Sequence, residues 1–338
     1  MSLILKMCSL LYGVVVGIRG WLYDRGIVRS YRSRIPVVSV GNITAGGNGK
    51  TPLCMMIARE LGQRGLRVAI LSRGYGGRER GPHRVTGSDV ASQVGDEPLL
   101  MAQSGFQVYV SRSRVTGVQA IEREGTADVV LLDDGLQHRA LERDLDIVSV
   151  FAGTEESVLA FLRGELLPAG LFRESRGKAL QRASLIVFSH RSVLSSAGLP
   201  SVDERLLGVI PPGRAVFRSY LEADQVVWMV SQERLPPQDV VAFAAIANPE
   251  GFFASLEQIG FRVRKTFSYP DHYQYRESDL ASIHQEFPDL PLVCTEKDAV
   301  KLHSLSNSVV ERVAFMRVVA RVVPGDAFIA RILRGIQR

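Results

Sequence analysis

Apolar and polar positions alternate along the chain in a pattern that predicts strands and helices in turn. Short apolar runs, typical of buried strands, lead into segments whose apolar residues recur every three to four positions, which is typical of helices. This alternation favours a parallel sheet with helices on both faces. In the first part of the chain the pattern predicts a strand starting near residue 35, a helix at 52–64, strands at 67–72 and 107–111, a helix at 113–124, and strands at 128–133, 145–150 and 185–189.

A second α/β unit is expected to begin at Asp239. Its predicted elements are a strand to residue 246, a helix at 249–259, a strand at 262–267, a helix near 277–287, strands at 292–295 and near 313–319, and a closing helix from 326. Two strand-like runs, 215–220 and 226–230, precede this unit and are predicted to pair as a hairpin that bridges the two parts. We therefore expect an N-terminal helix at 1–30, a nucleotide-binding domain at 31–213, a two-stranded linker at 214–230 and a smaller C-terminal α/β domain at 231–338.

A glycine-rich loop joins the first strand to the first long helix. It consists of Thr44, Ala45, Gly46, Gly47, Asn48, Gly49, Lys50 and Thr51, and Pro52 follows where the first turn of a helix accepts proline. In such a loop, glycines turn backbone N–H groups toward a polyphosphate, the lysine supplies a charge and the threonine hydroxyl ligates Mg²⁺. The usual pattern has glycine at the position of Thr44, and Gly46 with Gly47 supplies the flexibility instead. A merely flexible turn would leave the strand before the loop and the Lys-Thr pair after it unexplained.

Two adjacent acids, Asp133 and Asp134, end the apolar strand at 128–133. A carboxylate at this position can lie beside the Mg²⁺ of a phosphate loop, whereas a buried acid without a partner is costly. The alternative is a solvated turn closed by Gly135. Gln137 and His138 follow at the same sheet edge, where ligands of open α/β sheets bind, and they are candidates for contact with nucleotide, metal or acceptor, or for a simple capped turn.

Asp96 lies just before a helix-like run, in the string Gly-Asp-Glu-Pro at 95–98. Helix capping alone would explain a carboxylate there. Phosphoryl transfer to a hydroxyl, however, needs a base near the acceptor oxygen, and aspartate has this role in other kinases. We predict that Asp96 is this base.

His272 follows Asp271 in a loop of the second unit. A single histidine in a loop can be merely exposed. If closure of the two units brings it to Asp96, the imidazole would orient the carboxylate and share its proton, forming a dyad across two domains. The string Thr-Glu-Lys-Asp at 295–298 is not the Asn-Lys-x-Asp of guanine-reading loops, so the sequence favours ATP over GTP.

Composition limits the class of protein and its partners. The chain has 338 residues, of which 46% are hydrophobic and 22% charged, as in ordinary globular proteins. Three distant cysteines, Cys8, Cys54 and Cys294, form neither a disulfide framework nor a zinc site. The net charge of +6 is spread out and lacks the pattern of single-strand readers, so phosphates or acidic lipids explain it better than nucleic acid. No protein partner is evident.

An apolar stretch from Met7 to Ile18 opens the chain and a basic segment follows it. The arginines of that segment are Arg19, Arg25, Arg29, Arg32 and Arg34. The stretch is shorter than the roughly 20 apolar residues that cross a bilayer, and its flanks do not fit a signal peptide. It suits a helix lying in the membrane interface with its arginines on anionic head groups, although a helix packed into the core would also fit.

The motifs together resemble one family, tetraacyldisaccharide 4'-kinase, the lipid A kinase of Gram-negative bacteria. Matching strings occur in family order from near the start to about residue 300. They are residues 41–52, 72–77, 95–98, 133–138, 167–174, 247–249, 270–272 and 295–298.

The resemblance implies two α/β/α domains joined by a two-stranded linker, peripheral on the cytoplasmic face of the inner membrane. It also implies transfer of the γ-phosphoryl of ATP, with Mg²⁺, to the 4'-hydroxyl of an acylated glucosamine disaccharide 1-phosphate, giving the bis-phosphorylated lipid A precursor. Carried over by position, Lys50 and Thr51 serve phosphate and Mg²⁺, Asp133 and Asp134 the metal region, and Asp96 with His272 the hydroxyl-activating dyad. The remaining matches are assigned only to the general site: Asn42, Arg73, Gln137, His138, Arg173 and Glu174.

A rival from another class is a membrane-recruited dimeric switch ATPase of the partition and site-placement type. Such proteins use hydrolysis to time binding and transfer nothing to a metabolite. Their phosphate loop normally carries lysine just before the Gly-Gly pair, where this chain has Ala45. The sequence therefore favours the kinase.

Overall fold

The computed structural model describes residues 3–46, 49–190 and 200–337. The first unit of the molecule comprises strands β1 (Val37–Asn42), β2 (Val68–Ser72), β3 (His83–Arg84), β4 (Gln107–Val110), β5 (Val129–Asp133), β6 (Leu145–Phe151) and β7 (Leu185–His190). Its helices are α1 (Leu3–Asp24), α2 (Lys50–Gln63), α3 (Ala91–Val94), α4 (Asp96–Gln103), α5 (Arg114–Glu124), α6 (Glu155–Arg163), α7 (Arg176–Arg182) and α8 (Pro200–Leu207).

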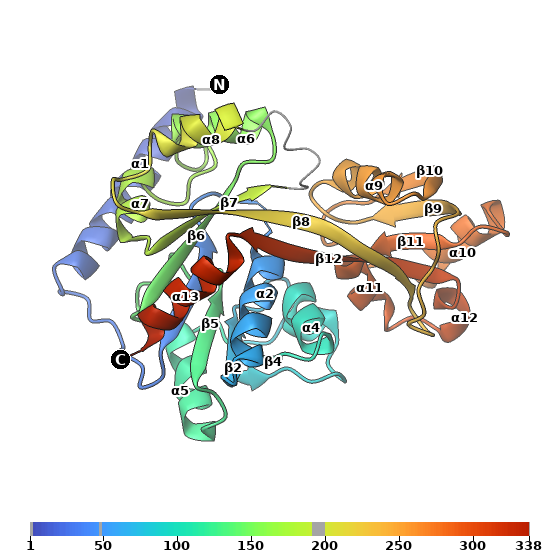
Figure 1. Ribbon diagram of the computed structural model, residues 1–338, viewed down its shortest axis with the longest axis horizontal. Coiled ribbons are helices and arrows are strands. Elements are labelled where there is room, and N and C mark those ends of the chain that lie inside the picture. Colours follow the sequence, from blue (N-terminus) through green and yellow to red (C-terminus); the bar gives the residue numbers. More distant parts are fainter. Residues whose placement is uncertain (1–2, 47–48, 191–199, 338) are drawn as a thin grey trace.

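The second unit comprises strands β9 (Asp239–Ala244), β10 (Arg262–Ser268) and β11 (Leu292–Thr295) with helices α9 (Pro249–Gln258), α10 (Glu277–Glu286), α11 (Glu296–Leu302) and α12 (Asn307–Val310). Two long strands, β8 (Ala215–Trp228) and β12 (Val313–Val323), run between the units, and helix α13 (Gly325–Ile336) ends the fold (Figure 1).

All these strands form one sheet in the order β10-β9-β11-β12-β8-β7-β6-β1-β5-β2-β4-β3. Neighbouring strands within each unit are parallel except for β3, which pairs antiparallel with β4. The predicted α/β class with a large parallel sheet is confirmed. Because parallel strands of one unit end at the same edge, the loops after β1, β2 and β5 meet there and form the site described below.

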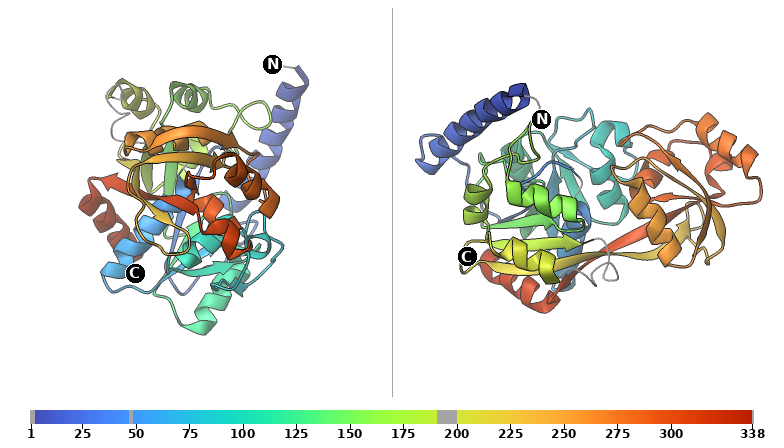
Figure 2. Two further views of the ribbon diagram at one scale, coloured as in Figure 1. Left: turned by 90° about the vertical axis from the view of Figure 1, so that its right-hand side faces the viewer. Right: turned by 90° about the horizontal axis from the view of Figure 1, so that it is seen from above.

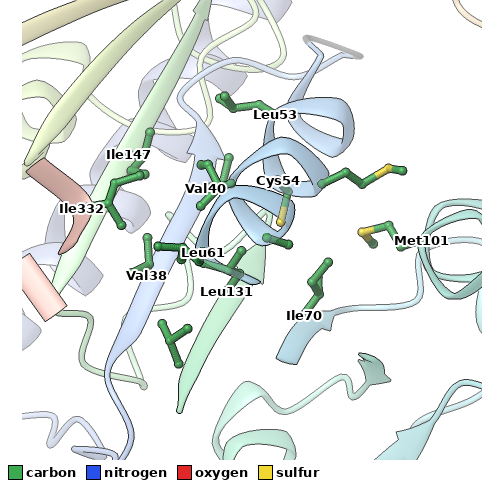
Figure 3. Close-up of a cluster of buried hydrophobic side chains, with 14 of the residues drawn as sticks. Val38, Val40, Leu53, Cys54, Leu61, Ile70, Met101, Leu131, Ile147 and Ile332 are labelled. Carbon is green, nitrogen blue, oxygen red and sulfur yellow. The ribbon is translucent and has the colours of Figure 1, made fainter. Parts of the chain in front are cut away.

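Helices cover both faces of the first unit, as the strand pattern predicts. One face of the sheet packs against α2, α4 and α13 through a core that includes Val38, Val40, Leu61, Leu131 and Ile332 (Figure 3). The opposite face packs against α5 through one cluster and against α6, α7 and α8 through another. Strands buried on both sides explain why their sequences are continuous apolar runs.

The second unit repeats this layering on a smaller scale. Its strands bury one face against α10 and α11 and the other against α9, around Phe243 and Phe252 respectively. The α9 helix starts at Pro249, with the Asn248 side chain accepting a hydrogen bond from the N–H of Gly251.

The predicted hairpin between residues 215–220 and 226–230 is wrong. Residues 215–228 form the single strand β8, whose antiparallel partner is β12, with Arg218 opposite Val323 and Trp228 opposite Ala314. Between the two predicted strands the only residue that favours a turn is Asp224, with no Gly, Pro or Asn beside it, so the strand continues. The two-stranded connection therefore joins segments almost a hundred residues apart, and both are visible as long strands crossing the middle of Figure 1.

The end of the chain returns to the first unit. Phe328, Ile329, Ile332 and Ile336 of α13 lie in the same core as Val38 of β1. In Figure 1 the C-terminus accordingly lies beside β6, far from α10. The last strand and helix of the predicted 231–338 domain thus contribute to the connection and to the first core.

Helix α1 lies along the side of the first unit and projects from the body (Figure 2). It spans 22 residues, with a mean hydropathy of 1.6 in its most apolar window. The prediction that this segment is too short to cross a bilayer is therefore wrong, because the helix extends beyond the apolar stretch at both ends. Length and composition permit a span, but a signal sequence would pass the same test, so they do not decide its role.

Candidate active site

The phosphate loop is built as a strand, a tight loop and a helix start. Gly49 precedes the first turn of α2 with φ 69°, a left-handed conformation that residues with a Cβ rarely adopt. Thr44 is bridged to Phe172, and the N–H of Ala45 donates to the carbonyl of Leu171 at 2.8 Å, so the loop is braced by the segment at 166–174. Gly47 and Asn48 lie outside the described residues.

Lys50 lies at the centre of a charged network at the carboxyl edge of the sheet. Its Nζ is 3.1 Å from Oδ1 of Asn42 and 3.4 Å from Oδ1 of Asp134. Asp134 also accepts a hydrogen bond at 2.7 Å from Nη1 of Arg173. Burial raises the pKa of Asp134, but Lys50 and Arg173 outweigh it and leave that pKa below its usual range. These contacts hold the ammonium beside the loop that would carry a phosphate.

Gln137 extends the network toward Glu174. Its Nε2 donates to the carbonyl of Asn42 at 2.9 Å and to Oε1 of Glu174 at 3.2 Å, and Arg182 Nη2 donates to Oε2 of Glu174 at 2.6 Å. Glu174 is buried, so these donors compensate its desolvation. The residues assigned from the sequence only to the general site are thus largely brought together with Lys50.

Asp133 is a buried carboxylate with spare ligand capacity. Burial raises its pKa to about 7, with the charges of Glu97 and Asp134 adding to the shift and those of Lys50 and Arg114 opposing it. Its Oδ2 is 3.4 Å from the hydroxyl of Ser72, and its Oδ1 has no hydrogen-bond partner. A buried oxygen of this kind suits a divalent cation, whose charge would favour the ionised form.

The rest of the metal environment fits Mg²⁺ bound together with phosphate. Within residues 3–46, 49–190 and 200–337, no three His, Cys, Asp or Glu side chains gather into a protein-only cage. Mg²⁺ usually takes one or two carboxylates and completes its shell with water and substrate phosphates. Asp133, Asp134 and the Thr51 hydroxyl would be the protein donors of such a site, which stays a prediction from the sequence.

His138 and Arg73 lie at the margin of the site. Burial lowers the pKa of His138 to about 4, and nearby cationic groups, Arg114 and Arg73 among them, add to the shift. The ring is therefore neutral at physiological pH. Arg73 is exposed on the loop that follows β2. Among the described residues, Arg73 acts electrostatically on His138 and Arg114, and neither Arg73 nor His138 has a recorded contact to Lys50.

Asp96 and His272 come together across the two units. Nδ1 of His272 is 3.0 Å from Oδ2 of Asp96, which lies buried in the first turn of α4. Gly95, just before Asp96, lets the loop at Tyr75 pack closely on the start of α4, since a Cβ there would lie 2.6 Å from the carbonyl oxygen of Tyr75. His272 itself has φ 64°, and its ring is 5.5 Å from that of Tyr75.

Sequence reasoning missed several residues of this site. Arg114 is buried and donates through Nη2 to the carbonyl of Asp133 at 3.1 Å. Glu97 acts on the pKa of Asp133 and forms an ion pair with Lys297. The start of α5 gave no signal for Arg114, whereas an acid next to Asp96 could have drawn attention to Glu97.

Helix α1 contacts the same site from the side. The Tyr12 hydroxyl donates to the carbonyl of Arg173 at 2.8 Å, and Arg19 Nη1 donates to that of Gln137 at 3.3 Å. Ser9 donates to the carbonyl of Leu166 at 2.7 Å. The N-terminal helix therefore packs against segments whose side chains surround Lys50.

Comparison with known proteins decides the family. A model of the family described as tetraacyldisaccharide-1-P 4'-kinase (LpxK) matches residues 1–337. The chain belongs to this family. The tetraacyldisaccharide 4'-kinase of Syntrophus aciditrophicus is 37% identical over 97% of this chain and 91% of its own length. That of Chlorobaculum parvum is 40% identical over 88% of this chain and 83% of its own.

Structural comparison agrees. A crystal structure titled as an "apo" form of LpxK from Aquifex aeolicus in complex with ATP matches with a TM-score of 0.77 and 28% identity, covering 97% of both chains. The resemblance expected from the motifs and the expectation of an ATP-dependent kinase are confirmed. As a member of the tetraacyldisaccharide-1-P 4'-kinase family, the chain is not expected to be a switch ATPase.

Proposed function

We propose that this protein transfers the γ-phosphoryl group of ATP to the 4'-hydroxyl of a tetraacyl glucosamine disaccharide 1-phosphate, with Asp96 as the base. The observation that carries this proposal is the contact between His272 and Asp96, at the edge of the sheet where Lys50 and the phosphate loop lie. A general base must reach the acceptor hydroxyl. Asp96 suits this role because His272, from the second unit, orients its carboxylate from outside the phosphate site.

The base works by accepting the proton of the 4'-hydroxyl as its oxygen attacks phosphorus. The new O–P bond forms while the bond between phosphorus and the β,γ-bridging oxygen breaks, so ADP leaves with that electron pair. His272 fixes the orientation of the carboxylate through Nδ1 and can pass the proton onward. Phosphorylation of the 4'-position yields the bis-phosphorylated lipid A precursor.

Lys50 stabilises charge on the transferring phosphoryl oxygens, and the network behind it holds its ammonium in place. Asn42 and Asp134 bind the Nζ, and Arg173 fixes Asp134 from the other side. Preorganised charge of this kind needs no rearrangement when negative charge develops. Bound Mg²⁺, held by Thr51, Asp133 and Asp134, would neutralise the β and γ phosphates.

The protein acts at the cytoplasmic face of the inner membrane as a peripheral enzyme. Helix α1 has no buried residue, and most of its large apolar side chains are exposed: Leu3, Ile4, Leu5, Met7, Leu10, Leu11, Val14, Val15, Ile18 and Trp21. Its other side holds to the body through Ser9, Tyr12 and the Arg139–Asp24 ion pair at 2.8 Å. A helix with one side on the protein and one apolar side free suits the interface, where exposed Arg25 and Arg29 would meet anionic head groups.

Polar substitutions on the free side of α1 should weaken membrane binding. In a triple variant with Leu10→Gln, Val14→Gln and Ile18→Gln, vesicle affinity should fall by at least about 10-fold, because each side chain buries apolar area in the interface. Co-sedimentation with anionic vesicles measures the vesicle affinity. A matched triple variant replaces exposed apolar residues elsewhere, Leu159→Gln, Leu207→Gln and Val230→Gln, and should bind as the wild type does. Equal binding by all three proteins would show that α1 does not enter the interface.

The reaction itself is tested with γ-labelled ATP and three acceptor conditions: acylated disaccharide 1-phosphate, free glucosamine, and none. We expect label transfer only to the acylated disaccharide, since α1, whose free apolar side suits a lipid interface, contacts the segments of Arg173 and Gln137 beside the site. Rapid turnover without acceptor would indicate a switch ATPase, and transfer to glucosamine would indicate a soluble sugar kinase.

A further inference from the structure

Lys297 reaches from the second unit to both segments that carry the dyad. It lies in the first turn of α11, and its Nζ is 3.6 Å from Oε1 of Glu97 and 3.8 Å from Oδ1 of Asp271. Glu97 directly follows Asp96 in α4, and Asp271 directly precedes His272. One ammonium group therefore joins the two chain segments whose side chains form the dyad.

Helix α11 and the His272 loop are fixed to the same point of the second unit. The N–H of Ala245, just after β9, donates to both carboxylate oxygens of Asp298 at 3.2 and 3.1 Å. The carbonyl of Ala245 accepts from the N–H of His272 at 3.3 Å. Asp298 is fully buried and pairs with Lys301 at 2.7 Å. The hydroxyl of Thr295, the N-cap of α11, accepts from the N–H of Asp298 at 3.1 Å and donates to its carboxylate at 2.6 Å.

Because of this shared attachment, Lys297 and His272 keep a fixed relation to each other. A contact that places Lys297 on α4 also places His272 on α4. Without Lys297, the described contacts from His272 to the first unit are the hydrogen bond to Asp96 and the ring contact with exposed Tyr75. The imidazole lies at a turn with positive φ, so its direction depends strongly on how the loop is held.

The position of Lys297 is unfavourable for the helix that carries it. A cation in the first turn opposes the helix dipole, and α11 already has Glu296 and Asp298 there. Its side chain is only 22% exposed, between two carboxylates of different units. The ion pair with Glu97 across the interface and that with Asp271 beside His272, rather than helix stability, account for a lysine at this place.

We propose that Lys297 is a positioning residue for phosphoryl transfer, which holds the His272 loop against the start of α4 so that the imidazole orients Asp96. It acts through Glu97 and Asp271 and does not touch the reacting atoms. This inference rests on the proposed role of the dyad. The inference gives the Lys297–Glu97 ion pair between α11 and α4 a role in the phosphoryl-transfer step.

The test is Lys297→Met, which keeps the length of the side chain and removes its charge. We expect kcat to fall roughly 10- to 100-fold while ATP affinity and the KM for ATP stay near wild type, because misplacement of a catalytic group affects the transfer step. Lys297→Arg should restore most of the rate, since a guanidinium can bridge the same two carboxylates. The matched control is Lys265→Met, at an exposed lysine of β10, which should match the wild type.

A double variant separates positioning from a general structural effect. Adding Lys297→Met to His272→Gln should cost little beyond His272→Gln alone, because both changes remove the same orientation of Asp96. Losses that multiply, an unchanged kcat in Lys297→Met, or a loss confined to ATP affinity would each overturn the inference. Thermal melting of each variant verifies that it is folded. If Lys297→Met does not fold, Lys297→Arg still tests the inference.

Failure of this inference can be told apart from failure of the proposed function. If Asp96→Asn retains full transfer, the role of the dyad is wrong whatever Lys297 does. If Asp96→Asn is inactive and Lys297→Met equals the wild type, only the positioning role of Lys297 is wrong.

Discussion

Replacing Lys50 with alanine should reduce phosphoryl transfer by at least about 10³-fold, because the site loses the charge that meets the developing negative charge on the γ-phosphoryl group. The fold should persist, since Asp134 keeps its hydrogen bond from Arg173 at 2.7 Å after the ammonium is gone. Single-turnover transfer from labelled ATP to the acylated disaccharide measures the loss. Circular dichroism melting checks the fold.

The matched control for this change is Lys178→Ala, at an exposed lysine of α7. It removes one positive charge from the first unit without touching the phosphate loop, so any general effect of net charge on membrane or substrate binding would appear in both variants. Near-normal transfer by a folded Lys50→Ala protein would mean that the triphosphate binds elsewhere.

Much of the first unit could be predicted from the sequence, because its strands are continuous apolar runs and its helices have clear periodicity. The phosphate loop and the paired acids after β5 carry their own local chemistry, so Lys50, Asp133 and Asp134 were recognisable without a structure. The periodicity does not show which strands are neighbours. The sequence therefore did not show that β8 pairs with β12, about a hundred residues further along the chain. Its middle carries no strong turn signal, so β8 continues as one strand and does not fold back into the predicted hairpin.

Short helices were the other elements that pattern reasoning missed. Helix α11 begins at Glu296 and is seven residues long, too short for a helical period to be recognised from the sequence. The role that we propose for Lys297 depends on this helix. The contact of Lys297 between the units and that of Arg114 within the first unit both follow from tertiary packing and have no signal within a local window.

Changing Asp96 to asparagine should lower kcat by roughly 10²- to 10⁴-fold, the range for loss of a general base, with little change in ATP affinity. Asparagine keeps the size of the side chain and can still face His272, so the variant removes mainly the ability to accept a proton. Rapid-quench transfer at saturating ATP and lipid gives kcat, and equilibrium titration gives nucleotide affinity. If ATP affinity collapses while the bound complex still transfers its phosphoryl group, Asp96 is a nucleotide ligand and the base lies elsewhere.

The dyad adds a second constraint on this result. His272→Gln should cost less than Asp96→Asn, because the carboxylate remains able to take the proton but is less well oriented. The double variant should be about as slow as Asp96→Asn alone, since the imidazole has nothing left to orient. Losses that simply multiply would mean that His272 contacts the acceptor or phosphate independently. The contact at 3.0 Å would then be a structural link between the units and no part of the base.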